Sequence, residues 1–190
     1  MRRPTSSGPE EGTRLPLIHT DFEQTATTPS DPAAKKRFCS RCGEPAMDPP
    51  VGSEPPPFEQ RVCGVCGMGI LLRCNPDALP GAGSAFLIAD HKLAIAAVSE
   101  AAEPIFAPEE RLTGTSVLDV LSSTIGDRKL AKTISRAALR VHDAVTVPTR
   151  LTGPKADEIG TMACRISTCG PPRAALIAVE PTHFGRRPAS

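Results

Sequence analysis

The sequence contains no tryptophan and no tyrosine, and only six phenylalanines among its 190 residues. It also lacks an excess of charge of either sign. Lys and Arg number 22 against 21 Asp and Glu, which gives a formal net charge of +1. Nucleic-acid binding requires a concentrated positive surface, and single strands also require aromatic rings on which bases stack. The scarcity of both features argues against nucleic acid as a partner.

Long apolar runs are missing as well. A membrane-spanning helix needs about 18 consecutive apolar residues, and no window of the sequence approaches that length. The N-terminus, "MRRPTSSGPEEG", carries two arginines but no apolar segment after them, so we expect no secretory signal. These absences predict a cytoplasmic protein that makes no membrane contact. A reducing cytosol disfavours structural disulfides, so the seven cysteines need another explanation.

Sequence signatures of common enzyme classes are absent too. The chain has no P-loop and no Gly-x-Gly-x-x-Gly before a helix, and no Ser/His/Asp arrangement in a recognisable context. The glycine-rich stretch "GAGSAF" at 81–86 precedes a predicted strand, which is the wrong order for a phosphate-binding loop. We therefore expect a protein that is not an enzyme and has no catalytic residues.

The cysteines show a clear pattern. Cys39 and Cys42 form one CxxC pair, and Cys63 and Cys66 form a second, each followed by glycine. A CxxC turn directs two thiolates to one point, and two such turns supply the four ligands of a tetrahedral structural Zn²⁺ site. The spacer between the pairs has the length that is typical of such sites. The pattern predicts a structural zinc ion, with iron in the same cage or redox dithiols as the alternatives.

The segment around these pairs, residues 37–74, is too short to bury a core of its own, so metal binding would supply the missing stability. A site with four cysteine ligands has no open coordination position, and we expect the zinc to take no part in catalysis. Acidic and basic residues balance in this segment, which favours contact with protein over contact with nucleic acid. Cys74 is either a further thiol near the site or a free cysteine at the end of the ribbon.

Composition divides the chain into five segments. Residues 1–36 are rich in Pro, Ser, Thr, Gly and charge, and we expect a disordered tail there. Its only apolar patch, "LPLIHTDF" at 15–22, is either a chance cluster or a short docking motif. The remaining segments are a zinc ribbon at 37–74, a linker at 75–83, a globular domain at 84–181 and a second tail at 182–190.

Residues 84–181 have a regular hydrophobic pattern. It predicts two short strands, a series of short helical pieces that begin after Ser99 as an N-cap, one long helix and three further strands. The long helix covers 127–141, where Leu130 and Ile134 mark an apolar stripe. Cys164 is expected to face the core, and Cys169 to lie at a strand end.

The stretch "FLIADHKLAIAAVSEAAEPIFAPEERLTGTSVLDVLSS" resembles a PAS domain. The resemblance is carried by Asp90 in the first turn, by "SEAAE" at 99–103, by "GTS" at 114–116 and by "LDVL" at 118–121. It implies an α+β fold, with a PAS-like five-stranded antiparallel sheet and helices on one face, preceded by the small zinc ribbon. The four paired cysteines lie outside the matching part.

PAS domains sense small molecules, light, redox state or partners. The resemblance implies a small regulatory protein that senses a ligand in the PAS-like cavity or a partner, and acts through a protein partner or a homodimer with the ribbon as interaction module. The Asn-Cys-Arg motif of flavin photosensors is missing, and His142, just past the long helix, is interpreted as a surface histidine rather than a haem ligand. Two other functions stay open, a zinc-ribbon transcription-associated factor that binds nucleic acid and a thiol redox switch.

The last predicted strand, "RAALIAVEP", is apolar on both faces. Leu176 and Ala178 lie on one face, and Ala175, Ile177 and Val179 on the other. An antiparallel sheet with one solvated face would alternate apolar and polar residues instead. We therefore expect the ribbon, its linker or a second chain to cover the outer face.

Overall fold

A computed structural model of the chain describes residues 36–46, 61–139, 143–153 and 156–180. The expected N-terminal tail, apart from Lys36, lies outside these ranges, as do the apolar patch at 15–22, the tail at 182–190 and His142. The expectations for those segments stay predictions.

The described elements follow the expected order, with two additions. They are β1 (Lys36–Cys39), β2 (Pro45–Ala46), β3 (Leu71–Cys74), the 3-10 helix η2 (Pro76–Ala78), β4 (Phe86–Ala89), β5 (Ile95–Val98), the 3-10 helix η3 (Glu100–Ala102), α1 (Glu109–Leu112), α2 (Val117–Val120), β6 (Leu121–Ser123), α3 (Asp127–Leu139), β7 (Val145–Leu151), α4 (Ala156–Ile159), β8 (Thr161–Gly170) and β9 (Ala174–Glu180). From β4 onward this is strand, strand, short helices, long helix and three strands, with β6 and α4 added. The α+β class is confirmed.

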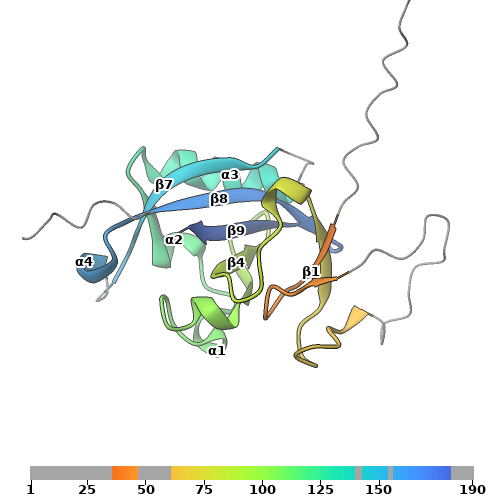
Figure 1. Ribbon diagram of the computed structural model, residues 1–190. Coiled ribbons are helices and arrows are strands. Elements are labelled where there is room, and N and C mark those ends of the chain that lie inside the picture. The colour runs from red at the N-terminus through yellow and green to blue at the C-terminus, as the bar shows by residue number, and fades with distance from the viewer. Residues whose placement is uncertain (1–35, 47–60, 140–142, 154–155, 181–190) are drawn as a thin grey trace, which may run out of the picture. The chain divides into compact units, whose positions relative to one another are not determined.

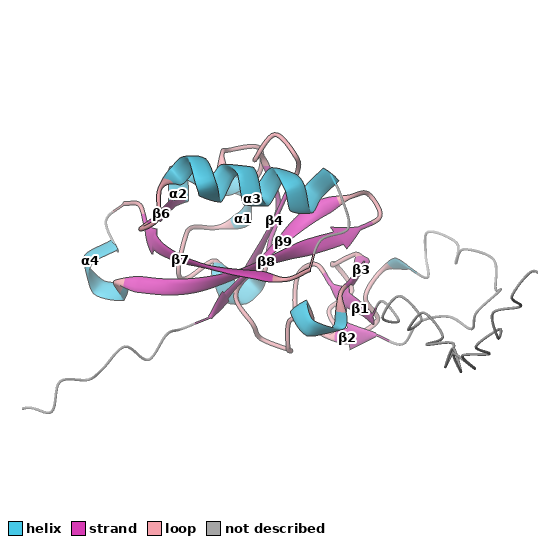
Figure 2. Ribbon diagram, turned by 90° about the horizontal axis from the view of Figure 1, so that it is seen from above, coloured by secondary structure: helices cyan, strands magenta, loops and turns pink. Residues whose placement is uncertain are grey.

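An antiparallel sheet forms the body of the protein (Figure 1). Its strands lie in the order β5-β4-β9-β8-β7, and the short β6 pairs with β7. The long helix α3 lies along one side of the sheet and contacts β8 and β9 (Figure 2). Among the described helices none is long and apolar enough to cross a membrane.

The helix-covered face holds the larger hydrophobic core. Leu130 and Ile134 of α3 are fully buried there, against Cys164 and Ile166 of β8 and Ile177 of β9. The spacing of four between Leu130 and Ile134 places both side chains on the side of α3 that faces the sheet. The predicted apolar stripe of this helix is therefore confirmed.

The ribbon strands continue the same sheet. β1 pairs with β2 and β3, and β3 pairs with the end of β8 through Arg73 opposite Gly170 and Cys74 opposite Cys169. Since β9 occupies one edge of β8, both β7 and β3 share the other edge. The boundaries proposed at 74 and 84 stay a prediction. The residues between these boundaries are bonded to both the ribbon and the main sheet. The Gly83 N–H donates to Cys42 O of the ribbon at 3.1 Å, and Arg165 of β8 donates to Asp77 O at 2.7 Å.

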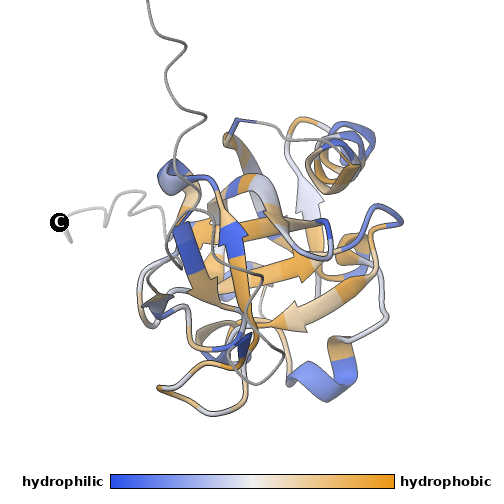
Figure 3. Cartoon of the chain, turned by 90° about the vertical axis from the view of Figure 1, so that its right-hand side faces the viewer, coloured by the Kyte–Doolittle hydropathy of each residue, from blue (hydrophilic) through white to orange (hydrophobic). Residues whose placement is uncertain are grey.

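The ribbon covers the outer face of the sheet. Phe38, Leu72 and Cys74 pack there against Phe86, Ile88, Cys169, Ala174, Leu176 and Ala178. The rings of Phe38 and Phe86 meet edge to face, with their centroids 5.6 Å apart. Viewed from the side on which β1 lies in Figure 1, the strands are coloured mainly as hydrophobic (Figure 3). The two apolar faces of β9 are thus both buried. The outer face is covered by the ribbon, and Leu79 of the linker packs against the same cluster.

Substitution of two neighbouring residues of β9 tests whether each one packs in a different core. Leu176→Ala and Ile177→Ala should each lower the free energy of unfolding by about 2–5 kcal/mol, because each removes a fully buried side chain. Only Leu176→Ala should speed backbone hydrogen exchange in β1 and β3, since its side chain packs against the ribbon, whereas Ile177→Ala should act on α3 and β8. Unchanged protection of β1 and β3 in the Leu176→Ala protein would contradict this packing.

Candidate metal centre

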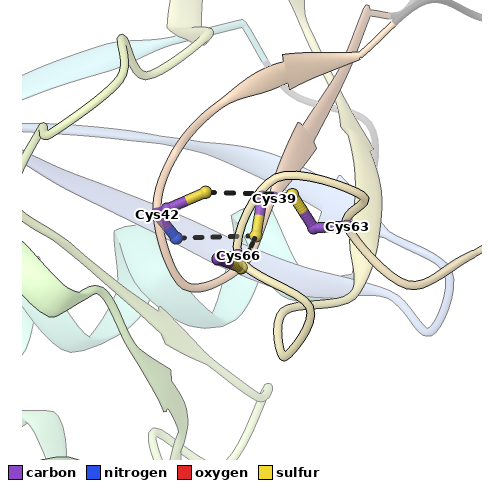
Figure 4. Close-up of side chains that lie close together, drawn as sticks. All are labelled: Cys39, Cys42, Cys63 and Cys66. Carbon is purple, nitrogen blue, oxygen red and sulfur yellow. Dashed lines mark hydrogen bonds between the residues drawn. The ribbon is translucent and has the colours of Figure 1, made fainter.

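The four predicted cysteines come together at the tip of the ribbon. Cys39 ends β1, Cys42 lies in the turn after it, and Cys63 and Cys66 lie in the loop that leads to β3. Their Sγ atoms all lie within 4.8 Å of one another. Figure 4 shows the side chains converging from the two loops, with 3.5 Å between Cys39 Sγ and Cys66 Sγ and 3.9 Å between Cys42 Sγ and Cys63 Sγ.

This geometry fits a tetrahedral ion. Zn–S bonds of about 2.3 Å set the edges of a regular S₄ tetrahedron at about 3.8 Å. The Cys39–Cys66 and Cys42–Cys63 Sγ–Sγ distances, 3.5 and 3.9 Å, lie close to that value. The group consists of thiols alone, and soft thiolate ligands in a tetrahedron suit zinc or iron rather than magnesium or calcium. The four cysteines could therefore hold a metal ion, and zinc is the ion that the donor set favours.

Backbone amides point at the sulfurs. The N–H groups of Arg41 and Cys42 donate to Cys39 Sγ at 3.4 and 3.5 Å, and the Gly69 N–H donates to Cys66 Sγ at 3.4 Å. Amides from Met68 and Gly69 lower the pKa of Cys66 to about 6, whereas burial raises the pKa of Cys39 to about 12. A bound divalent cation would compensate the negative charge that four thiolates bring to one point.

Glycines allow the two turns to close. The residue after each second cysteine is left-handed, with φ of +75° at Gly43 and +68° at Gly67, as the repeated Cys-Gly pattern predicts. Sequence reasoning missed a third glycine, Gly69. A Cβ on Gly69 would overlap Cys39 Sγ and lie 2.9 Å from the Arg41 nitrogen. The signal was present in "CGMG", where a second glycine stands two residues after the first.

Arg41 joins the first cysteine turn to the short helices η3 and α1. Its guanidinium contacts Glu109 Oε2 at 2.8 Å and Glu103 Oε1 at 3.4 Å, and its carbonyl accepts from the Glu100 N–H at 2.9 Å. The other oxygen of Glu109 accepts from the Val98 N–H at 3.2 Å. Glu109 lies 68 residues after Arg41 in the chain, and no local sequence pattern indicates the contact.

The other three cysteines do not belong to the group of four. Cys74 and Cys169 are cross-strand partners in the outer cluster, and burial raises the pKa of each to about 12. Cys164 is buried on the helix side, as predicted, with its Sγ 3.0 Å from Thr149 Oγ1, and burial raises its pKa to about 11. Buried thiols with raised pKa values are poor nucleophiles, and Cys164 and Cys169 lie in different clusters.

In comparisons with known proteins, no protein-family model, no curated protein and no solved structure matches this chain. The resemblance of residues 84–181 to a PAS domain and of residues 37–74 to a zinc ribbon therefore stays a prediction from the sequence.

Replacement of single cysteines tests the ligand set. Cys63→Ser should abolish stoichiometric zinc binding, because a hydroxyl replaces one of four thiolates, whereas Cys74→Ser should keep one zinc per chain, because Cys74 lies outside the group. Zinc content is measured by native mass spectrometry and elemental analysis of the purified variants. The helical circular-dichroism signal should survive in both, since no ribbon residue belongs to the core under α3. Full zinc occupancy in the Cys63→Ser protein would rule out this assignment.

A pair of glycines in the same loop tests the packing of the two turns. Gly69→Ala should weaken zinc binding by about 10- to 100-fold, because the new methyl group overlaps a ligand sulfur. Gly64→Ala is the matched control, since a Cβ at that position meets no atom within 4 Å. Affinities are measured by competition with a chromophoric chelator. Equal affinities of the two variants would show that the turns do not need this close approach.

Proposed function

We propose that this chain is a non-enzymatic regulatory protein, in which a PAS-like module senses a small ligand or a partner and a zinc-bound ribbon presents the result to another protein. The observation that carries the proposal is the clamp on Arg41. This residue lies inside the first cysteine turn, yet its side chain is held by Glu103 and Glu109 of the module. These ion pairs join the first cysteine turn directly to η3 and α1.

The arrangement of strands and helices supports the PAS-like part. Five antiparallel strands carry α3 on one face, and the short helices lie between β5 and β7 in the chain, as the resemblance implies. The "GTS" segment also has a local role. Ser116 caps α2, with its hydroxyl accepting from the Leu118 N–H and its own N–H donating to Asp119.

We propose a surface hollow as the site of the sensed ligand. It has a volume of about 240 Å³ and is lined by Ile105, Phe106, Arg111, Val120 and Leu151, among others. Most of its wall is apolar, which suits a small apolar ligand, and Arg111 offers one positive charge.

The short helix α1 connects this hollow to the ribbon. Arg111 of α1 lines the hollow, and Glu109 of the same helix holds Arg41. A ligand that shifts α1 would therefore shift Glu109. The shift would strengthen or weaken the ion pair between Glu109 and Arg41 of the first cysteine turn. A ligand can shift α1 from one position to another only if it binds the protein more tightly when α1 is in the second position.

Removal of the Arg41 side-chain charge tests the connection. Arg41→Gln should leave one zinc per chain and raise backbone hydrogen exchange in α1 and η3 by roughly fivefold, because a partly exposed ion pair contributes about 1 kcal/mol. In the unaltered protein, chelation of zinc should raise exchange in α1, and in Arg41→Gln it should add little. Arg150→Gln, an exposed arginine on β7, is the control. If chelation leaves α1 unchanged in the unaltered protein, the ribbon and the module do not communicate, and the proposal fails.

A further inference from the structure

A second hollow lies where the ribbon meets the module. Its volume is about 300 Å³, and its lining combines Cys42 and Glu44 from the first cysteine turn, Val65 from the second, the backbone at 82–83, and Glu100 and Ala101 of η3. The lining is mainly apolar, with the two carboxylates as its charged groups. Both cysteine turns and the module contribute to it, so its shape depends on all three being held together.

The second cysteine turn next to this hollow exposes large apolar side chains. Val65 is 74% exposed, Met68 68% and Ile70 42%. The other large hydrophobic residues that are exposed in the described part of the chain lie singly, on separate elements or their ends. They are Ile125, Leu139 and Ile159. Single exposed apolar residues are ordinary, but three within six residues, of which Val65 also lines the hollow, are typical of an interaction site.

Charge indicates what kind of partner fits. The residues that line the hollow include Glu44 and Glu100 but no lysine or arginine. Arg41, the nearest cation of the first turn, is already paired with Glu103 and Glu109. Four thiolates around a divalent ion would add two further negative charges. The site therefore repels phosphate and attracts a positively charged group.

We propose that this hollow and the exposed side chains of Val65, Met68 and Ile70 form a docking site for a basic, apolar segment of another protein. A Leu, Ile or Met side chain of the partner occupies the hollow against Val65 and Ala101. A lysine or arginine within three residues of it pairs with Glu44 and Glu100, and a further apolar residue covers Met68. The proposal deepens the proposed function, since it assumes the zinc-bound ribbon and names the chemistry of its partner.

A random 12-residue peptide library displayed on phage tests the site with the zinc-loaded full chain as bait. Selection should enrich peptides in which a large aliphatic residue lies within three positions of Lys or Arg. Synthetic copies of two enriched peptides are then measured by fluorescence anisotropy. Their Kd should rise about tenfold for Met68→Ser and about threefold for the double variant Glu44→Gln/Glu100→Gln, with weaker binding at high salt. Ile159→Ser, which removes an exposed apolar side chain on α4, should leave Kd unchanged.

Several results would overturn the proposal. They are the absence of any enriched motif, enrichment of acidic peptides, or equal affinity of Met68→Ser and the unaltered chain. Concentration-dependent self-association that Met68→Ser abolishes would assign the surface to a second copy instead. Zinc content and the Arg41-dependent exchange are measured on the same preparation. If the chain binds zinc and shows the Arg41-dependent exchange but no peptide binds, only the proposed docking site is wrong. A chain without zinc would overturn the docking site and the proposed function together.

Discussion

The fold depends on the burial of a sheet that is apolar on both faces. β9 places Ile177 in the core under α3 and Leu176 in the cluster under the ribbon, and both are fully buried. A helix layer alone would leave the second face in water at a cost of about 25 cal/mol for each Å² of apolar surface. The ribbon removes that cost with only a few large side chains, chiefly Phe38 and Leu72. We expect a metal ion bound by the cysteine cluster at its tip to stabilise the ribbon further, because so short a segment has no core of its own.

Different contacts join the two ends of the ribbon to the rest of the chain. The apolar cluster and the pairing of β3 with β8 hold the strands of the ribbon. The ion pairs of Arg41 hold the first cysteine turn, together with the backbone hydrogen bonds from Glu100 to Arg41 O and from Gly83 to Cys42 O. Apolar packing is insensitive to direction, whereas an ion pair loses strength when one carboxylate moves by a few ångströms. Under the proposed function, the strands stay in place while the position of the turn, and with it the hollow beside Glu44 and Glu100, responds to the helices.

Local patterns predicted the local features. The two CxxC pairs identified Cys39, Cys42, Cys63 and Cys66 because ligand spacing within a turn is a short-range property. The absence of apolar–polar alternation in residues 173–181 showed that both faces of β9 need cover. Long-range contacts were out of reach. Nothing near Arg41 in the sequence indicates Glu109. Ser99 lies at the N-cap position of η3, as expected. Its hydroxyl, however, accepts from the Phe86 N–H and donates to Ser84 O instead of capping the helix, so tertiary bonds override its local preference. The place where β3 joins β8 could not be read from the sequence either.

The shared edge of β8 has a consequence for the history of this chain. β7 pairs with residues 161–166 of that strand and β3 with residues 169–170, so one strand serves both parts. A recombination event that exchanged the ribbon for an unrelated one would have to supply residues equivalent to Phe38 and Leu72 in the same register, or leave Leu176 and Ala178 in water. A substitution in the outer cluster on one side of residues 75–83 therefore has to be compatible with the residues that it contacts on the other side.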